Sequence, residues 1–176
     1  MIKYFDENEV VSAKKQRNKA LTVFFSVLFV YLLSVAAFLI ITYNLPYGQS
    51  PLLYKIIEYS LTALFVIFSF IFLGIPFRRI NRYVRLVVNL NTGIRETSTA
   101  TFLEYDENLH DKDGVDCKAL VFLEWNKYKK DYFERKVLVF YEKDFPVIPE
   151  NAEVKFITQG NFLIEYEIID GGFSAE

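Results

Sequence analysis

The chain's single histidine and single cysteine, His110 and Cys117, are its first candidates for acid–base or nucleophilic chemistry. His110 has no Ser, Cys or second His beside it in the sequence, although the partners of a triad can also converge in space. Cys117 opens an apolar segment, where a buried and inert thiol is expected. Walker, Rossmann and HExxH patterns do not occur. We therefore expect no enzyme, no catalytic residue and no bound cofactor.

Acidic residues gather in the segment 104–116, where their oxygens could serve as ligands for Ca²⁺. They are Glu104, Asp106, Glu107, Asp111, Asp113 and Asp116. Their spacing does not follow the twelve-residue EF-hand loop, and the Asp-Gly pair at 113–114 is typical of a turn. We therefore expect a solvated loop without a metal site. One cysteine also excludes an intramolecular disulfide and any metal site built from several cysteines.

A basic and aromatic run occupies residues 127–132, and such a mixture is found in nucleic-acid sites. It consists of Lys127, Tyr128, Lys129, Lys130 and Tyr132. From residue 97 onward, however, the chain has nine Lys and Arg against seventeen Asp and Glu, whereas nucleic-acid recognition requires a clustered basic face. We expect a solvated connection between two strands and no nucleic-acid partner.

Two uncharged apolar segments, 20–42 and 59–77, precede these polar candidates. The first contains 23 residues, of which 15 are Leu, Ile, Val or Phe. As a helix it would be about 34 Å long, against roughly 30 Å of hydrocarbon in a bilayer. A cleaved signal peptide is the alternative, but its apolar region spans about 7–15 residues and its small residues follow that region. Here Ser34, Ala36 and Ala37 lie inside the run, so we predict two transmembrane helices in a hairpin.

Basic residues flank the two segments at the outer ends of the predicted hairpin, where we expect them at the membrane surface. They are Lys14, Lys15, Arg17, Lys19, Arg78, Arg79, Arg82 and Arg85. The connector offers Lys55, beside Glu58. Positive residues stay on the cytosolic side, so both termini are predicted to be cytosolic. Neither span contains Asp, Glu, Lys, Arg or His, which transport pathways usually place inside the helix bundle.

Pro76 lies where the second span should leave the bilayer, and proline kinks or ends a helix. After it, Arg78, Arg82 and Arg85 recur at helical spacing, with apolar residues on the opposite side. This pattern predicts an amphipathic helix over 77–91 that stops at Thr92-Gly93. The helix either lies on the inner leaflet, with its arginines at anionic headgroups, or packs its apolar side on the soluble domain.

From residue 98 the pattern changes to short β-type runs broken by turn residues. The predicted strands are 98–105, 117–125, 133–141, 152–158 and 161–168, with a tight turn at Gln159-Gly160. Five such strands indicate a small antiparallel β-barrel or a sandwich. We thus expect a membrane protein of mixed α and β structure. Its parts are a cytosolic segment 1–19, a hairpin 20–77, a basic juxtamembrane helix 78–96 and a cytosolic β-domain 97–176.

Two of these strands are apolar at consecutive positions, 119–123 and 137–141, whereas a strand with one face in water alternates. Both faces are therefore covered. The cover is the juxtamembrane helix, another copy of the chain or a different partner, unless the two strands are the centre of a two-layer core. A possible interaction face is formed by Leu120, Phe122, Leu138 and Phe140.

The segments Glu153-Val154-Lys155-Phe156 and Phe162-Leu163-Ile164-Glu165-Tyr166 look like the closing strands of a barrel. With them, the layout of the whole chain resembles NfeD-like proteins, small bacterial inner-membrane proteins with an OB-type barrel behind a membrane hairpin. The resemblance implies a scaffold that partners other membrane proteins. We expect a membrane-tethered interaction module that self-associates or joins a membrane complex. The alternative is a small oligomeric membrane component that handles an ion or a small molecule.

Overall fold

The computed structural model describes residues 1–126 and 128–170, so Lys127 of the basic and aromatic run lies outside the described residues. The chain divides into two compact units. One unit combines Met1–Ala13 with the residues from Arg82 onward, and we call it the β unit. The other, Lys14–Asn81, is the helical unit.

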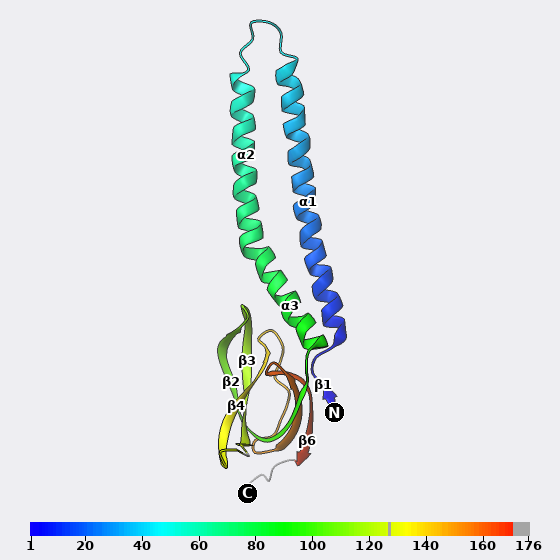
Figure 1. Ribbon diagram of the computed structural model, residues 1–176, viewed down its shortest axis with the longest axis vertical. Coiled ribbons are helices and arrows are strands. Elements are labelled where there is room, and N and C mark those ends of the chain that lie inside the picture. The colour runs from blue at the N-terminus through cyan, green and yellow to red at the C-terminus, as the bar shows by residue number, and fades with distance from the viewer. Residues whose placement is uncertain (127, 171–176) are drawn as a thin grey trace. The chain divides into compact units, whose positions relative to one another are not determined.

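The helical unit consists mainly of two long helices, α1 (Glu7–Tyr43) and α2 (Leu52–Phe72), shown side by side in Figure 1. Both are long and apolar enough to cross a membrane, and none of the residues in their apolar windows is buried inside the structure. Helix α1 begins well before the first predicted span, because residues 7–19 continue the same helix.

Aromatic rings join α1 to α2. The ring of Tyr31 stacks on Phe65 with centroids 4.2 Å apart, and its hydroxyl lies 3.2 Å from the hydroxyl of Thr62. About two turns earlier, Phe24 stacks on Phe68 and Phe72 at 6.4 and 5.8 Å. Half-buried residues of α1 recur at alternating spacings of three and four, the period of two helices packed along their length. They include Leu21, Phe24, Leu28, Tyr31, Val35, Phe38 and Thr42.

A single π-helical turn, η1 (Leu73–Phe77), connects α2 to α3 (Arg78–Thr92) without interrupting the helix. Pro76 lies inside this turn. A proline inside a helix lacks one donor and crowds the preceding turn, and π-type turns are common at such irregularities. The predicted helix over 77–91 is thus confirmed to within one residue, but the discontinuity at Pro76 is a wider turn rather than an end.

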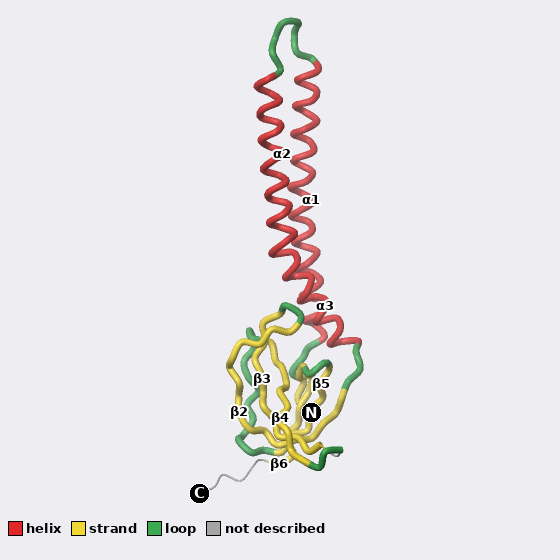
Figure 2. The backbone as a smooth tube through the Cα atoms, turned by 60° about the vertical axis from the view of Figure 1, so that its left-hand side comes forward, coloured by secondary structure: helices red, strands yellow, loops and turns green. Residues whose placement is uncertain are grey.

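The β unit is a closed five-stranded barrel with one extra strand (Figures 1 and 2). The strands are β1 (Ile2–Lys3), β2 (Glu96–Lys112), β3 (Val115–Asn126), β4 (Asp131–Phe140), β5 (Glu153–Gln159) and β6 (Phe162–Asp170). Their order is β1-β6-β4-β3-β2-β5, and pairing of β5 with β6 closes the barrel. All pairs are antiparallel except β4 with β6. Of the two predicted β architectures, the barrel is therefore the observed one.

Two tight turns set the register of the barrel. Asp113 and Gly114 have φ values of 57° and 77°, and Gly160 and Asn161 have φ values of 56° and 70°. Two consecutive positive φ values are those of a type I′ turn, whose twist matches that of the flanking strands. The Asp-Gly turn is confirmed, and the second turn lies one residue later than the predicted Gln159-Gly160.

The acidic segment 104–116 is not the loop that the sequence predicted. Strand β2 continues to Lys112 and pairs with β3 up to the turn, with Asp111 opposite Asp116 and Lys112 opposite Val115. The register shifts between Asp106 and His110, and such a bulge absorbs extra residues while the strands remain paired. The type I′ turn allows the hairpin to continue to its tip.

Two apolar cores account for the strands that are apolar on both faces. Leu120 and Phe122 are fully buried in the barrel interior. On the outside of the barrel, a second core contains Phe140 and has Leu138 packed against it. All four residues of the possible interaction face are therefore covered within the chain. The cover of the second core comes from α3 and the N-terminal segment: Phe5, Val10, Leu86, Val87 and Leu90.

The β unit also includes the first residues of the chain. Strand β1 pairs with β6, with Ile2 opposite Tyr166 and Lys3 opposite Glu165. The amides of Tyr4 and Phe5 both donate to the carbonyl of Ile164, at 2.9 and 3.1 Å. The N-terminal segment predicted over 1–19 is thus divided: residues 1–13 belong to the β unit, and residues 14–19 belong to the helical unit.

Candidate functional site

A polar cluster on the outer face of the barrel contains His110, the chain's one histidine. Its centre is Asp106, whose side chain is 8% exposed. Lys136 Nζ donates to Asp106 Oδ2 at 2.7 Å, and His110 Nε2 lies 3.0 Å from the same oxygen. The backbone and side-chain nitrogens of Asn108 donate to Asp106 Oδ1 at 3.1 and 2.7 Å. We call these four residues the Asp106 cluster.

Strand β3 makes this cluster possible, because it lies between the two strands that carry the charged partners. Asp106 of β2 is opposite Ala119 of β3, and Lys136 of β4 is opposite Val121 of β3. A small side chain at position 119 leaves room for the carboxylate and the ammonium to meet above the strand.

The hydrogen bonds from Lys136, then those from His110 and Asn108, hold the pKa of Asp106 well below its usual range. The carboxylate therefore remains ionised at neutral pH and is unsuited to act as a general acid.

Cys117 is opposite His110 in the β2–β3 register. The Cys117 thiol donates to the backbone carbonyl of Val115 at 3.3 Å. Burial, followed by the charges of Asp111 and Asp116, raises the pKa of Cys117 to about 12. Nucleophilic attack requires a thiolate and an accessible sulfur, and Cys117 is fully buried. The burial of Cys117 that the sequence predicts is confirmed.

The acidic residues of segment 104–116 are dispersed along the hairpin. Asp106 belongs to its own cluster, and Asp111 Oδ1 accepts the amide of Gly114 at 3.0 Å, which stabilises the turn. Asp111 and Asp116 face each other across the hairpin. Within residues 1–126 and 128–170, no group of three or more His, Cys, Asp and Glu side chains is placed to hold a metal ion.

A second polar cluster closes one end of the barrel interior, and sequence reasoning missed it. Arg135 is 11% exposed, and its Nη1 donates to Glu124 at 3.0 Å and to Ser98 at 2.9 Å. Its Nη2 donates to Glu96 at 2.8 Å and to Thr158 at 3.1 Å. Burial alone would lower the pKa of Arg135, but Glu124 and Glu96 outweigh it and raise that pKa. We call this the Arg135 cluster.

The position of Arg135 follows from strand alternation. Val137 and Val139 of β4 are in the barrel interior, and residues two apart in a strand share a face, so Arg135 is on the inner side as well. Four of the five barrel strands contribute to the cluster, and the guanidinium lies 5.7 Å from the ring of Phe156. Counting back in steps of two from Val137 would have identified this residue from the sequence.

A third cluster holds the N-terminal segment against the barrel. Lys143 forms an ion pair with Glu9 and donates to the carbonyl of Tyr4 at 3.0 Å. The hydroxyl of Tyr4 donates to the carbonyl of Asp144 at 2.9 Å. Burial, followed by the charges of Glu9 and Asp144, raises the pKa of Tyr4 above its usual value, so its hydroxyl stays protonated as a donor. We call this the Lys143 clasp.

The predicted membrane-surface residues lie in the N-terminal part of α1 and in α3. On α1, Lys14, Lys15 and Lys19 are exposed and Arg17 is half-buried. On α3, all four predicted arginines are exposed: Arg78, Arg79, Arg82 and Arg85. Within the β unit, Arg82 lies against Gly114 at the tip of the β2–β3 hairpin. The apolar face of α3 is used by the second core, so the part of α3 from Arg82 onward packs on the barrel.

Exposed aromatic side chains gather where β3 and β4 meet. Trp125 and Tyr132 are opposite each other in the register, and their rings form a T-shaped pair with centroids 4.8 Å apart. They are 46% and 59% exposed, and Tyr128 between them is fully exposed.

No family model, curated protein or solved structure matches this chain.

Proposed function

We propose that this chain is a multi-pass protein of a bacterial inner membrane whose β unit serves as a cytosolic interaction module of a membrane complex. In this proposal residues 20–42 and 59–77 span the bilayer as a hairpin, and both termini are cytosolic. The basic residues at the outer ends of the hairpin then face the cytosolic leaflet, in agreement with the positive-inside rule.

The composition of the β unit is the observation that carries this proposal. Residues 1–13 and the chain from Arg82 onward fold together, and Phe5 and Val10 are buried in the second core. Two segments that share a core occupy one compartment. The intervening chain must therefore leave and return to the same side, which two spans accomplish. A cleaved signal peptide is disfavoured, because cleavage would remove strand β1 and part of that core.

The exposure of the two apolar windows supports bilayer residence. The core helix of a soluble protein is mostly buried, but none of the residues in the windows of α1 and α2 is buried. Large apolar patches on a surface indicate contact with a membrane or another protein. In a bilayer the same surface would contact hydrocarbon, and the backbone polar groups would remain paired within the helices.

We assign the interaction surface of the module to Trp125, Tyr128 and Tyr132. Aromatic residues are enriched at protein interfaces and dominate their binding energy. The barrel's strand order, with one parallel pair between β4 and β6, is that of an OB-type Greek-key barrel. Barrels of this type bind their ligands over the second and third barrel strands, here β3 and β4. The part of that face left open by α3 carries these aromatic side chains.

Labelling of single cysteines tests the membrane arrangement. In a Cys117→Ala background, Tyr47→Cys lies in the connector and Tyr128→Cys lies in the β unit; both tyrosines are fully exposed. A membrane-impermeant maleimide applied to intact cells should label position 47, and position 128 only after permeabilisation. Labelling of position 128 in intact cells, or recovery of the chain without detergent, would refute the proposal.

Site-specific photocrosslinking tests the interaction role. A photoreactive phenylalanine analogue at position 132 should give a discrete crosslinked species in cells at native abundance. The same analogue at Val147, which is 86% exposed on the β4–β5 connection, serves as the control and should give none. A chain that remains uncrosslinked at position 132 and monomeric in mild detergent would contradict an interaction module.

A further inference from the structure

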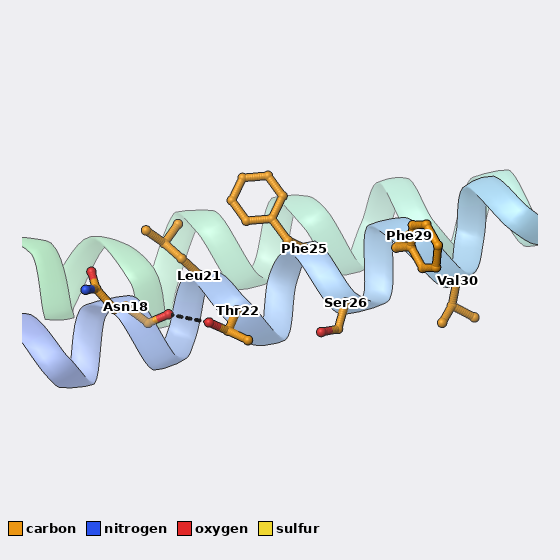
Figure 3. Close-up of a pocket in the computed structure, with 7 residues that line it drawn as sticks. All are labelled: Asn18, Leu21, Thr22, Phe25, Ser26, Phe29 and Val30. Atoms are coloured by element: carbon orange, nitrogen blue, oxygen red, sulfur yellow. Dashed lines mark hydrogen bonds between the residues drawn. The ribbon is translucent and has the colours of Figure 1, made fainter.

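Exposed surfaces of the two units differ in what they present to a partner. The outer face of α1 between Asn18 and Val30 carries exposed side chains such as Phe25 and Phe29 (Figure 3). Its backbone groups are paired within the helix, and contact with hydrocarbon accounts for it in the proposed membrane arrangement. One edge of β4, in contrast, presents backbone groups that have no strand beside them.

The first half of β4, drawn in yellow in Figure 1, has a free edge. Strand β6 lies parallel to β4 and begins at Phe162, opposite Leu138, so residues 131–137 extend beyond the start of β6. On their other side these residues pair with β3 throughout. Among residues 1–126 and 128–170, no further strand pairs with β4. The edge is accessible, because residues 131–134 and 136 are exposed.

Two hydrogen bonds show which backbone groups face this edge. The amide of Tyr141, just after β4, donates to the carbonyl of Asp116 in β3 at 3.2 Å. The amide of Leu138 donates away from β3, to the carbonyl of Asn161 at 2.7 Å. Backbone groups alternate between the two edges of a strand, so the even-numbered residues within 132–136 direct their amides and carbonyls to the free edge.

The long basic side chains of this part of β4 do not protect the edge. Native sheets often place lysine or other charges on a free edge to prevent pairing. Lys136 instead extends across β3 to Asp106, and Arg135 is turned into the end of the barrel. The amide of Tyr132 donates to the carboxylate of the preceding Asp131 at 2.8 Å. A strand that accepted this amide would leave that carboxylate available to another partner.

We propose that the free edge of β4 pairs, antiparallel, with the same edge of a second copy of the chain, about a two-fold axis at Phe133. In this register Phe133 is opposite its own counterpart. Tyr132 is opposite Glu134 of the second copy, and these residues exchange backbone hydrogen bonds. Asp131 is opposite Arg135 of the second copy. Aromatic pairs and opposite charges favour cross-strand contact, so the edge is complementary to itself, as a two-fold interface requires.

The two registers next to it on one side are less favourable. An axis at Glu134 would place the two Glu134 carboxylates opposite each other, and like charges directly opposite are destabilising. An axis at Arg135 would place Tyr132 opposite Leu138, where Asn161 already occupies the edge. Because the paired segment is short, the dimer dissociates on dilution. The inference rests on the proposed interaction role and identifies its partner as a second copy.

Disulfide formation tests the axis. In a Cys117→Ala background, Phe133→Cys, Tyr132→Cys and Glu134→Cys are made singly in the full-length chain, which is oxidised mildly in detergent. Across the axis the Cα atoms of position 133 would be about 4.5 Å apart, within disulfide range. Positions 132 and 134 are each displaced from their counterparts by two residues, so they should crosslink at least about tenfold more slowly. Faster crosslinking at 132 or 134 than at 133 would overturn this axis.

Charges placed at the axis test self-recognition. Phe133→Asp and Phe133→Lys each lose the ring contact and bring like charges together, so each should weaken dimerisation by about tenfold or more in sedimentation of the full-length chain. An equimolar mixture of the two variants should restore a mixed dimer. Val147→Asp and Val147→Lys, on the exposed β4–β5 connection, are the controls and should leave dimerisation unchanged. Unchanged dimerisation in both Phe133 variants would overturn the proposal.

Proline tests the backbone pairing. The amide of Glu134 faces the free edge, where proline is tolerated because the pairing with β3 does not use that amide. Glu134→Pro should therefore weaken dimerisation by about tenfold or more, whereas Glu134→Ala, which keeps the amide, should weaken it less than about threefold. Equal effects of the two substitutions would overturn strand pairing as the mode of contact.

Failure of this inference is distinguishable from failure of the proposed function. A photocrosslink from position 132 to a different protein, together with a monomeric purified chain, would support the interaction role and overturn the second copy as its partner. A chain that is monomeric and remains uncrosslinked at position 132 would overturn both.

Discussion

Lys136 on β4 extends across β3 to donate a 2.7 Å hydrogen bond to Asp106 on β2, and this carboxylate is nearly buried. The contact joins strands that are not neighbours in the sheet. It also places an ionised carboxylate in a position from which water is largely excluded, where each hydrogen bond to the charged form favours ionisation.

Acid should destabilise the β unit through Asp106. The pKa of Asp106 is lowered in the folded state, whereas an unfolded aspartate titrates near 3.9. The stabilisation is thus fully present above about pH 5 and is lost as the pH falls through 3.9 toward the folded-state pKa. We expect Asp106→Asn to be less stable than the parent at pH 7 and to show a flatter stability profile below pH 5.

Thermal unfolding of the full-length chain in detergent between pH 2.5 and 8 measures this profile. Asp113→Asn at the exposed hairpin tip is the matched control and should keep the acid-side slope. An Asp106→Asn profile parallel to that of the parent over the whole range would show that Asp106 has no part in the pH dependence.

The sequence predicted four of the five barrel strands and the existence of the helices, because their apolar periods are long or clear, although α1 and α2 both begin earlier than the predicted spans. It misplaced the end of β2, since acidic residues are disfavoured in strands and the pairing of Asp111 with Asp116 leaves no apolar signal. The Asp-Gly turn was nevertheless visible as a hairpin signal. Extending the strands to that turn would have corrected the error.

Two further features depend on long-range pairing, which a single sequence conceals. Strand β1 has two residues, too few to show a period. The Lys143 clasp joins residues more than 130 positions apart. The sequence left several covers for the apolar strands open, among them the juxtamembrane helix; the structure places α3 on them together with the N-terminal segment, which the sequence did not indicate.

Truncation of the barrel core should be strongly destabilising. Phe122 is fully buried and its ring contacts those of Phe102 and Phe156 at 5.6 and 4.5 Å. Phe122→Ala should lower the free energy of unfolding by about 3–5 kcal/mol, because it removes apolar burial and leaves a cavity. Phe133→Ala, at a side chain that is 42% exposed, should cost less than about 1 kcal/mol in the same urea titration.

The Arg135 cluster should show non-additive mutational effects. Arg135→Met leaves the half-buried Glu124 carboxylate without its partner, and breaking such a pair costs about 3–5 kcal/mol. Glu124→Leu/Arg135→Met replaces both charges by apolar groups and should recover most of the loss, because apolar replacements of buried pairs are often neutral. Urea titrations of the two variants give the comparison. Equal stability of the single and double variants would mean that the ion pair is not the source of the effect.

Loss of the Lys143 clasp should release the N-terminal segment without unfolding the barrel. Lys143→Ala removes both the ion pair with Glu9 and the donor to the carbonyl of Tyr4. A hydrogen bond to a charged group contributes about 1.5–3 kcal/mol, so hydrogen exchange at the amides of Tyr4 and Phe5 should accelerate about tenfold or more.

The amide of Phe102, which donates to Ala152 within the barrel, provides the internal reference and should exchange as in the parent. Lys112→Ala removes an exposed lysine at the end of β2 and serves as the matched substitution, with no change in hydrogen exchange expected at Tyr4 or Phe5.

If hydrogen exchange in Lys143→Ala accelerated at Phe102 to the same degree, the clasp and the barrel would open as one cooperative unit. Unchanged exchange at Tyr4 and Phe5 would mean that β1 and the second core hold the segment without Lys143. Because Phe5 and Val10 share the second core with α3, the predicted outcome in Lys143→Ala is local opening around Tyr4 and Phe5 while the barrel stays folded.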